Sequence, residues 1–473
     1  MNDIRNIFGV SDAQLQSLVA EGLKAGGSWC DLYFEHTSYL DLLLRDSEVG
    51  SAGYHIDYGC GIRVLSGEKT GYAYSESTDY NSLLAAARAA SAIATASSGG
   101  RLEIPSCSSM SHDGSLYHMD RDWMNVEIAE FTPYLERLEA EIRRRDSRVG
   151  KVVALLSASV CDIMMYNSLG ELCTDSRPLG SLSVQLTATQ GDKIESRRVS
   201  RSFRMGAEFL TEEMLQELAA EAVAGLDASF EATRPRGGRM PVVMAAGASG
   251  ILLHEAMGHA FEADFNRKGQ SIFSDKMGKT IARKGINIVD DGTLPFNRGS
   301  VAVDDEGVPG QKTYMVADGV LNSYLHDRIS AGWYGVAPTG NGRRESFRYN
   351  PIPRMRATYM ESGTDGTLQD LIGSVKQGIF VNQFSNGQVK IGEGDFTFYV
   401  KSGFMIENGR LTMPVKDVNI IGNGPEALAD IDAVAGDLKI DNGTWTCGKE
   451  QSAAVSCGIP SVLVRKLTVG GGE

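Results

Sequence analysis

Residues 241–265 read PVVMAAGASGILLHEAMGHAFEADF, and this stretch decides how the C-terminal half of the chain is organised. Its first six residues, PVVMAA, are typical of a buried strand. The glycines of GASG predict a tight turn, and the residues that follow have the apolar positions of a helix packed against that strand. The sequence therefore predicts a strand, a turn and a helix that carries His254, Glu255 and His259.

This helix has the side chains of a zinc site. Two of the seven histidines lie five residues apart, and a glutamate directly follows the first. Imidazole is the commonest zinc-ligating side chain, and a glutamate beside a metal-bound water is the usual base in metal-assisted peptide hydrolysis. We therefore expect His254 and His259 to bind zinc and Glu255 to act as general base. The alternative is two ordinary helix histidines, with Glu255 on a solvated face.

The five-residue spacing constrains the helix. Each residue turns an α-helix by about 100°, so side chains four residues apart diverge by about 40°, whereas those five apart diverge by about 140°. A regular helix cannot direct both imidazoles at one ion. A π-bulge, with its i to i+5 hydrogen bond, would realign them, and Gly258 lies where this distortion costs least. The sequence predicts a bulge or widened turn between Met257 and His259.

The third zinc ligand must come from elsewhere, because a catalytic zinc usually has three protein ligands and one open position. The best candidates are Cys447, in TWTCG, and His326, in YLHDR; Glu262 and Asp264 on the same helix follow. Cys447 could equally be a buried strand thiol. The residues alone do not choose among these four.

Composition narrows the class of protein. The net charge of −14 argues against binding to the phosphates of DNA or RNA, which depends on clustered basic residues. No apolar stretch approaches the roughly 20 residues of a membrane-spanning helix, and the first ten residues do not read as a signal peptide. The seven dispersed cysteines predict free thiols in a reducing compartment. We expect a cytoplasmic enzyme.

The pattern of elements predicts an α+β fold with mostly antiparallel or mixed sheets and flanking helices. Three domains are expected. Residues 1–110 and 111–233 each form an α+β domain, and residues 234–473 form a β-rich domain. The last domain contains the helix with His254, Glu255 and His259, called the metal helix below. Helices are predicted at 11–26, 80–98, 123–145 and 211–226, after Thr367 and at Pro425. Strands are predicted at 30–44, 60–74, 152–160, 163–166 and 182–190. Hairpin turns are predicted at Asp318-Gly319, Asn386-Gly387 and Asn408-Gly409.

Several blocks of the chain resemble the TldD/PmbA family of metallopeptidases, formerly described as modulators of DNA gyrase. The resemblance is specific to the TldD-like branch, because the PmbA/TldE-like branch lacks the HExxxH pattern. It covers nearly the whole chain. The blocks are LLHEAMGHAFEADFNRKGQSIFS (252–274), DYGCGIRVLSGEKTGYAY (57–74), DDEGVPGQKTYMVADGVLNSYLHDR (304–328), PTGNGRRESFR (338–348), IPRM (352–355), GDFTF (394–398), IIGNGPEAL (420–428) and TCGKEQS (446–452).

The resemblance implies that zinc is held by His254, His259 and Cys447, with Glu255 as general base. It implies short or unfolded peptides as substrates, held in extended form in a channel between subunits with weak side-chain preference. It also implies a partner, either a PmbA/TldE-like subunit or a second copy of the chain. A zinc metalloprotease is therefore the first hypothesis. The alternatives are a regulatory, gyrase-modulator-like subunit that binds peptides without cutting them, and a structural zinc closed by four ligands.

Three further residues are candidates for substrate binding. PTGNGRR could let a peptide backbone approach closely, with Arg343 or Arg344 meeting a carboxylate or an oxyanion. The alternative is a surface turn with solvated arginines. His326 could stabilise the transition state near the metal, or belong to a polar cluster at the end of a hairpin. GNGRR lacks the Gly-Lys-Ser/Thr end of a nucleotide-binding P-loop.

Overall fold

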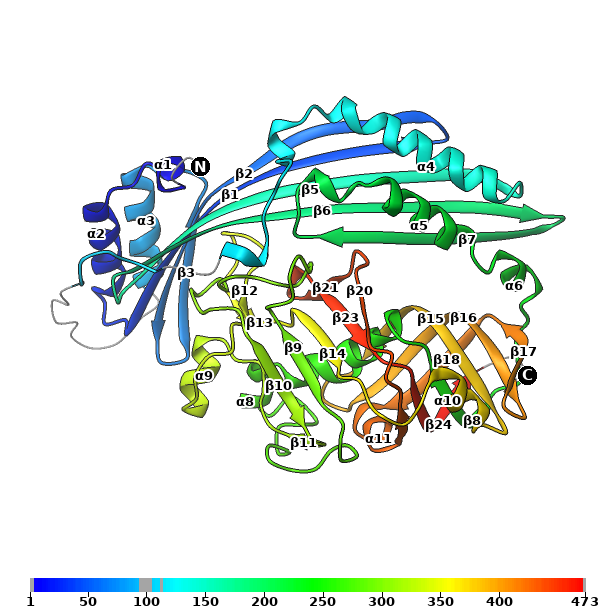
Figure 1. Cartoon of the computed structure of the whole chain (residues 1–473). Helices are drawn as coiled ribbons and strands as arrows, with labels where there is room; N and C mark the ends of the chain where they lie inside the picture. Colours follow the sequence, from blue (N-terminus) through cyan, green and yellow to red (C-terminus); the bar gives the residue numbers. More distant parts are fainter. Residues whose placement is uncertain (1–3, 93–103, 111–113, 471–473) are drawn as a thin grey trace.

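A long antiparallel sheet and a block of shorter sheets make up the protein (Figure 1). The computed structural model describes residues 4–92, 104–110 and 114–470. The long sheet comes from the first half of the chain, and the block below it comes from the second half. The predicted α+β class with antiparallel and mixed sheets is confirmed. Within the described residues, no helix has both the length and the apolar character needed to cross a bilayer.

The long sheet runs in the order β3-β2-β1-β5-β6, with β7 and the short β4 also paired to β6. Its strands are β1 (Trp29–Arg45), β2 (Glu48–Ser66), β3 (Lys69–Ser75), β4 (Ser108–Ser109), β5 (Val149–Asn167), β6 (Glu171–Gln190) and β7 (Lys193–Phe203). Strands from both sides of residue 110 therefore share one sheet, and the division into three domains stays a prediction.

Helices cover one face of this sheet. Even-numbered residues of β1, such as Leu32 and Phe34, contact the helices at one end, and Leu40 and Leu42 contact those at the other. Alternate residues of a strand point to opposite faces, so both groups of helices lie on the same face. The helices are α1 (Arg5–Phe8), α2 (Asp12–Leu23) and α3 (Tyr80–Ser91) at the first end, and α4 (Thr132–Arg145), α5 (Glu212–Val223) and α6 (Leu226–Glu231) at the second.

A five-stranded barrel organises the C-terminal block. Its strands are β8 (Gly238–Met244), β15 (Gln377–Val389), β16 (Asp395–Glu407), β18 (Val418–Asn423) and β24 (Val462–Gly470). The ring closes because β15 pairs with both β8 and β16. Beside these strands lie β17 (Arg410–Val415), β19 (Ile431–Val434), α10 (Leu368–Gly373) and α11 (Gly424–Ala429).

A six-stranded mixed sheet packs beside the barrel. Its order is β11 (Val320–Leu321), β10 (Lys312–Ala317), β9 (Ile288–Asp291), β14 (Ala357–Met360), β23 (Ser456–Ile459) and β20 (Lys439–Asp441). Two short hairpins complete the block, β12 (Gly342–Arg343) with β13 (Ile352–Pro353) and β21 (Thr446–Lys449) with β22 (Gln451–Ala454). The helices here are α8 (Ala263–Arg267) and α9 (Arg328–Tyr334).

Predictions based on caps and tight turns are mostly confirmed. The helices predicted from residues 11 and 211 begin there: Ser11 and Gln14 form a capping box at α2, and Thr211 caps α5. The helix after Thr367 and the helix with Pro425 in its first turn are α10 and α11. The turns at Asp318-Gly319 and Asn408-Gly409 join β10 to β11 and β16 to β17.

Other predicted elements are wrong in extent. The helix expected at 123–145 begins only at Thr132, with Pro133 in its first turn. The strand expected at 60–74 is a hairpin that turns at Gly67, and those expected at 152–160 and 163–166 are one strand, β5. The helix predicted at 80–98 ends after Ser91, and its last residues fall outside the described ranges.

The hairpin turn expected at Asn386-Gly387 is also wrong, because both residues lie inside β15. The ring of Phe398 on β16 covers Gly387 so closely that an added Cβ would lie 2.2 Å from it. The glycine is therefore needed for cross-strand packing, and the chain turns later, where Gly394 has a φ of 77°.

Buried ion pairs join the long sheet to the C-terminal block. Arg63 on β2 is fully buried and contacts two carboxylates. Its Nη2 lies 2.7 Å from Asp31 Oδ2 on β1, and its Nη1 lies 2.6 Å from Glu306 Oε1 of the block. These contacts hold the pKa of Arg63 above its ordinary value although burial opposes the charge. The two halves are therefore linked through a charge that water does not reach.

Replacing Arg63 with methionine should destabilise the whole chain, because Glu306 would lose its cation and Asp31 would keep only Arg344, at 3.5 Å. We expect the free energy of unfolding to fall by about 3–5 kcal/mol, measured by urea denaturation. Arg88→Met is the matched control, since the Arg88–Glu21 pair is solvent-exposed and should contribute less than about 1 kcal/mol. Equal shifts of the two denaturation midpoints would contradict the role of Arg63.

Candidate metal centre

The strand, turn and helix predicted at 241–265 are present, and the helix is distorted where the histidine spacing requires it. After β8 and a short turn, α7 (Ile251–Leu253) leads into a π-helical turn over His254–Gly258. The His259 N–H donates to the carbonyl of His254, which is an i to i+5 hydrogen bond. The predicted widening of the helix is confirmed.

This π turn lies in the core of the C-terminal block, between the barrel and the six-stranded sheet. A Cβ added to Gly250, just before α7, would lie 2.6 Å from the backbone nitrogen of Gly458 on β23. A Cβ added to Gly258 would lie 2.0 Å from Met355 Sδ. Glycine at both positions therefore lets the helix approach its neighbours closely enough to be fixed in place.

His254, His259 and Cys447 come together as a candidate metal site. One ligand atom from each lies within 4.8 Å of the others. Cys447 Sγ is 3.1 Å from His259 Nε2, and the two imidazole ring centroids are 5.2 Å apart at an interplanar angle of 80°. All three side chains are buried, and Cys447 lies on β21, next to its turn into β22. His254 Nδ1 has no hydrogen-bond partner in the described part of the chain.

Glu262 and Lys449 fix the orientation of the His259 ring. The Glu262 carboxylate accepts a hydrogen bond from His259 Nδ1 at 2.9 Å, which turns His259 Nε2 toward Cys447. Lys449 Nζ lies 3.1 Å from that carboxylate and 2.8 Å from Asp264, and Arg354 Nε lies 3.8 Å from it. Glu262 and Asp264 are therefore not in the ligand cluster, and the ligand set suggested by the resemblance is the one that the geometry brings together.

The charges of these groups reinforce one another. Burial opposes the Cys447 thiolate, but His254 and His259 lower the pKa of Cys447 to about 4. Burial also opposes a charged His259, yet Glu262 and Cys447 raise the pKa of His259 to about 10. Against its own burial, Lys449 and His259 hold the pKa of Glu262 at about 2. These pKa shifts favour a thiolate at Cys447 and an imidazolium at His259.

Glu255 follows the first histidine in the π turn and is half-buried, unlike its buried neighbours His254 and Ala256. Its carboxylate is close enough to the Cys457 thiol to help raise the pKa of that thiol, after the larger effect of burial. Cys457 is a buried thiol outside the ligand cluster. All seven cysteines are free thiols.

The three candidate substrate residues are buried rather than solvated. The Arg343 guanidinium donates to the carbonyls of Met355 at 2.5 Å and Ala454 at 2.8 Å. The Arg344 guanidinium stacks on Tyr33 of β1, 4.1 Å from the ring centroid. The surface-turn alternative is therefore wrong for both arginines, and a role in substrate binding stays a prediction.

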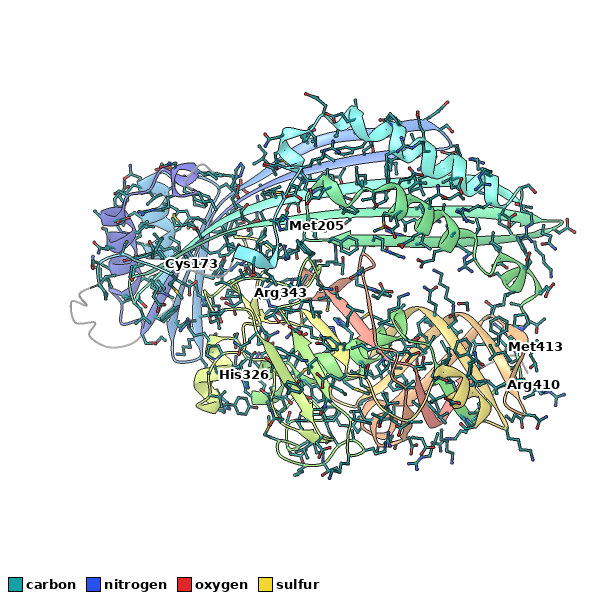
Figure 2. All side chains as sticks on the ribbon, in the orientation of Figure 1. Cys173, Met205, His326, Arg343, Arg410 and Met413 are labelled. Atoms are coloured by element: carbon teal, nitrogen blue, oxygen red, sulfur yellow. The ribbon has the colours of Figure 1, made fainter. Side chains whose placement is uncertain are left out.

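His326 lies outside the ligand cluster, beside α9 (Figure 2). Its ring packs against Tyr324 and Tyr334, and burial lowers its pKa to about 4. The neighbouring Asp327 caps α9 by accepting from the Ser330 N–H at 2.8 Å. His326 is thus a neutral, buried imidazole, and its suggested role in the transition state stays a prediction.

Sequence reasoning considered Glu262 only as a ligand and missed Lys449 and Arg354 altogether. One signal was available for Glu262, because a carboxylate three residues after a histidine lies on the same side of a helix. No local pattern connects Lys449 or Arg354 to Glu262. They meet because β21 and β13 pack against the metal helix, which is a tertiary effect.

Three segments match known domain descriptions. Residues 30–94 match PmbA/TldA metallopeptidase domain 1, and residues 122–230 match the central domain of the same metallopeptidases. Residues 237–471 match their C-terminal domain.

Whole-length comparisons agree with these matches. The chain is 38% identical over 449 residues to a metalloprotease TldD homolog of Haemophilus influenzae, covering 94% of this chain and 93% of the relative. It is 32% identical over 293 residues to a zinc metalloprotease TldD homolog of Saccharolobus solfataricus, covering 62% of this chain and 65% of the relative.

Two solved structures share the fold. One, from Thermotoga maritima and described as a modulator of a DNA gyrase, has a TM-score of 0.77 at 21% identity, covering 97% of this chain and 99% of the other. The other, TldE from Thermococcus kodakarensis, has a TM-score of 0.75 at 17% identity, covering 97% and 100%. At these identities the similarity concerns the fold alone.

Zinc binding should displace a proton from His259 rather than from Cys447, since a metal ligand must be deprotonated. With pKa values of about 10 and about 4, proton release should change little between pH 7.5 and pH 9. Ordinary values of about 6.5 and 8.5 would make the release decline over that interval as the thiol ionises. Calorimetry in buffers of different ionisation enthalpy measures the release.

The Glu262→Gln variant supplies the control for this measurement. Removing the carboxylate lowers the His259 pKa, so proton release at pH 9 should fall below that of the parent chain. Identical release by parent and variant at pH 9 would contradict the proposed charge coupling.

Gly258→Ala should destabilise the π turn, because the new methyl group would overlap Met355 Sδ. We expect a loss of about 1–3 kcal/mol in the free energy of unfolding, as for other overpacked cores, together with weaker zinc retention. Gly332→Ala in α9 is the control, since a Cβ there meets nothing within 4 Å. Thermal unfolding and bound zinc per chain are the measurements. An unchanged Gly258→Ala protein would show that the π turn tolerates a side chain.

Proposed function

Because the chain belongs to the PmbA/TldD metallopeptidase family, we propose that it is a zinc-dependent peptidase subunit. Its substrates would be short or unfolded peptides, cut with little side-chain preference. The observation that supports this most directly is the buried cluster of His254, His259 and Cys447 on a helix that also carries Glu255.

The donor set fits zinc. Two imidazole nitrogens and one thiolate sulfur are ligands that zinc binds well. In the ranges that the structure describes, no other His, Cys, Asp or Glu joins this cluster. Three ligands leave a position open, which favours a catalytic ion over a structural one. Zinc bound there would supply a Lewis acid that polarises a peptide carbonyl and makes a water molecule more acidic.

The chain's own residues would handle the proton. Glu255 is half-buried beside His254, so its carboxylate can accept the proton of the attacking water and later pass it to the leaving amine. Glu262 holds His259 in the tautomer that presents Nε2 to the metal. Lys449 keeps the Glu262 carboxylate charged. Glu255 and Glu262 thus have separate tasks, one in proton transfer and one in positioning.

The partner and compartment are further parts of this proposal. A fold shared with a protein named TldE, and close similarity to TldD homologs, support pairing with a PmbA/TldE-like subunit or with a second copy. Such pairing could enclose an extended peptide between subunits. A cytoplasmic location is consistent with seven free cysteines.

Glu255→Gln should keep zinc and lose peptide hydrolysis. Removal of a general base usually costs about 10²- to 10⁴-fold in rate, and we expect that range for kcat on an unstructured peptide. Cys447→Ser should lose zinc as well. Glu213→Gln, an exposed glutamate on α5, is the control and should match the parent chain. Bound zinc is measured by elemental analysis and cleavage by mass spectrometry. Full activity of Glu255→Gln would show that Glu255 is not the general base. Activity of the metal-free chain would contradict the zinc-dependent mechanism.

A further inference from the structure

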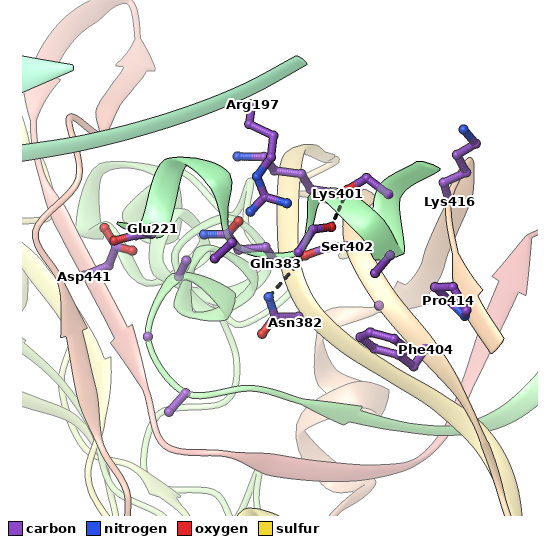
Figure 3. Close-up of a pocket in the computed structure, with 18 of the residues that line it drawn as sticks. Arg197, Glu221, Asn382, Gln383, Lys401, Ser402, Phe404, Pro414, Lys416 and Asp441 are labelled. Carbon is purple, nitrogen blue, oxygen red and sulfur yellow. Dashed lines mark hydrogen bonds between the residues drawn. The ribbon is translucent and has the colours of Figure 1, made fainter. Parts of the chain in front are cut away.

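A cavity of about 490 Å³ lies between the long sheet and the barrel. Its walls come from β7 and α5 on one side and from β15, β16 and β20 on the other (Figure 3). The loop at 246–248, which leads from β8 into the metal helix, forms part of its lining. The cavity is separate from the ligand cluster, and none of the functions described so far uses it.

The lining of this cavity is positively charged, whereas the chain as a whole is negatively charged. The chain carries a net charge of −14, yet the cavity is lined by five cationic side chains and only three anionic ones. The cationic side chains are Arg197, Arg201, Lys401, Lys416 and Lys439, and the anionic ones are Glu195, Glu221 and Asp441. An excess of positive charge in a concave site favours an anionic ligand.

Two of the carboxylates are already committed to other partners. Glu221 Oε2 accepts from Arg201 at 2.5 Å, and Glu195 Oε1 accepts from Lys416 at 2.8 Å. The third, Asp441, accepts from the backbone of Gly443 and the indole of Trp445. Within the described residues, Arg197 and Lys401 form no ion pair with a carboxylate, although Glu221 and Glu195 favour the charge of Arg197 from a longer distance.

Arg197 projects from β7 into the cavity, and Lys401 reaches from β16 toward the same strand (Figure 3). Within the described residues, Arg197 Nε is buried without a hydrogen-bond partner. Lys401 Nζ donates to the carbonyl of Arg198 at 3.0 Å, which leaves two of its three hydrogens. Burial lowers the pKa of both side chains, and the charge of Arg197 lowers that of Lys401 further. An anion between them would relieve this repulsion.

Polar groups below the two cations could complete an anion site. The pairing of β15 with β16 shifts register around Gln383, which lies opposite Ser402. Such a bulge re-aims side chains, and Asn382, Gln383 and Ser402 all line the cavity (Figure 3). Asn382 Nδ2 donates to Ser402 Oγ at 3.2 Å. The Gln383 amide and the Ser402 hydroxyl can therefore supply hydrogens beside the cations.

The cavity extends toward the metal helix. Asp441 lies directly opposite Cys457 in the pairing of β20 with β23. Gly250, at the start of the metal helix, packs on Gly458, the residue after Cys457. Asp441 and Glu255 both raise the pKa of the Cys457 thiol, after burial. Asp441, in the cavity wall, is thus linked to the metal helix through β23.

We propose that this cavity binds the C-terminal carboxylate of a peptide, held between Arg197 and Lys401. Apolar side chains beside the cations, Phe404 and Val415 among them, suit the last residue of a peptide. The three carboxylates in the walls would oppose a doubly charged phosphate more strongly than a singly charged carboxylate. The inference rests on the proposed peptidase function, since it identifies the chain end of the substrate.

Binding can be tested without hydrolysis on the zinc-loaded full chain carrying Glu255→Gln. An N-acetylated penta-alanine with a free C-terminus and its C-terminal amide are compared by calorimetry. The free acid should bind about tenfold more tightly, as expected for a charge-assisted hydrogen-bonded pair. Adding Arg197→Gln or Lys401→Gln should abolish this preference. Arg410→Gln, an exposed cation on β17 (Figure 2), is the control and should preserve it. Circular dichroism verifies folding of each variant.

Other results would overturn the proposed carboxylate site or separate it from the proposed peptidase function. Equal affinity for acid and amide overturns it, as does a preference that survives both Arg197→Gln and Lys401→Gln. Inorganic phosphate that binds in an Arg197-dependent manner, without competing with the free acid, reassigns the cavity to phosphate and also overturns it. A preference for the free acid in a chain whose parent cleaves neither peptide would leave the carboxylate site standing while the proposed peptidase function fails.

Discussion

A single backbone hydrogen bond, from the N–H of His259 to the carbonyl of His254, sets the geometry of the metal centre. It replaces the ordinary α-helical bond and brings two imidazoles five residues apart into one cluster with Cys447. A π turn of this kind is costly in isolation. It persists here because Gly258 and the buried residues around it pack closely against Met355 and the barrel. The chemistry of the site therefore depends on the packing of a whole domain.

Four buried charged groups contact one another in series: Cys447 contacts His259, His259 contacts Glu262, and Glu262 contacts Lys449. Cys447 and Lys449 lie two residues apart on β21, so one short hairpin supplies a candidate ligand and the cation that contacts the Glu262 carboxylate. Buried charges contribute little net stability when compared with apolar packing. Here these charges fix the orientation of the side chains, because each group must adopt a rotamer that keeps its contacts with the neighbouring groups.

Local patterns predicted the parts of the structure that local physics determines. The histidine spacing was enough to predict the widened turn, and Ser11, Thr211 and Thr367 were enough to predict helix starts. Cys447 could be selected only through resemblance to a family, because no pattern in one chain links it to His259. The burial of Arg343 and Arg344 and the charge chain behind the metal site come from contacts between distant segments. The strand at Gly387 was mistaken for a turn because the Phe398 ring that covers it lies on another strand.

The closed barrel determines when the metal centre can exist. His259 and Cys447 are 188 residues apart in the chain, and β8, which precedes the metal helix, pairs with β24 at the far end. During synthesis both histidines leave the ribosome long before their third ligand, and the barrel cannot close until its last strand has emerged. Domains fold as units during translation, so the candidate metal site can reach its final geometry only after β24 has emerged. An emerging chain thus carries an incomplete site, because Cys447 and the strand that closes the barrel, β24, both follow the two histidines in the chain.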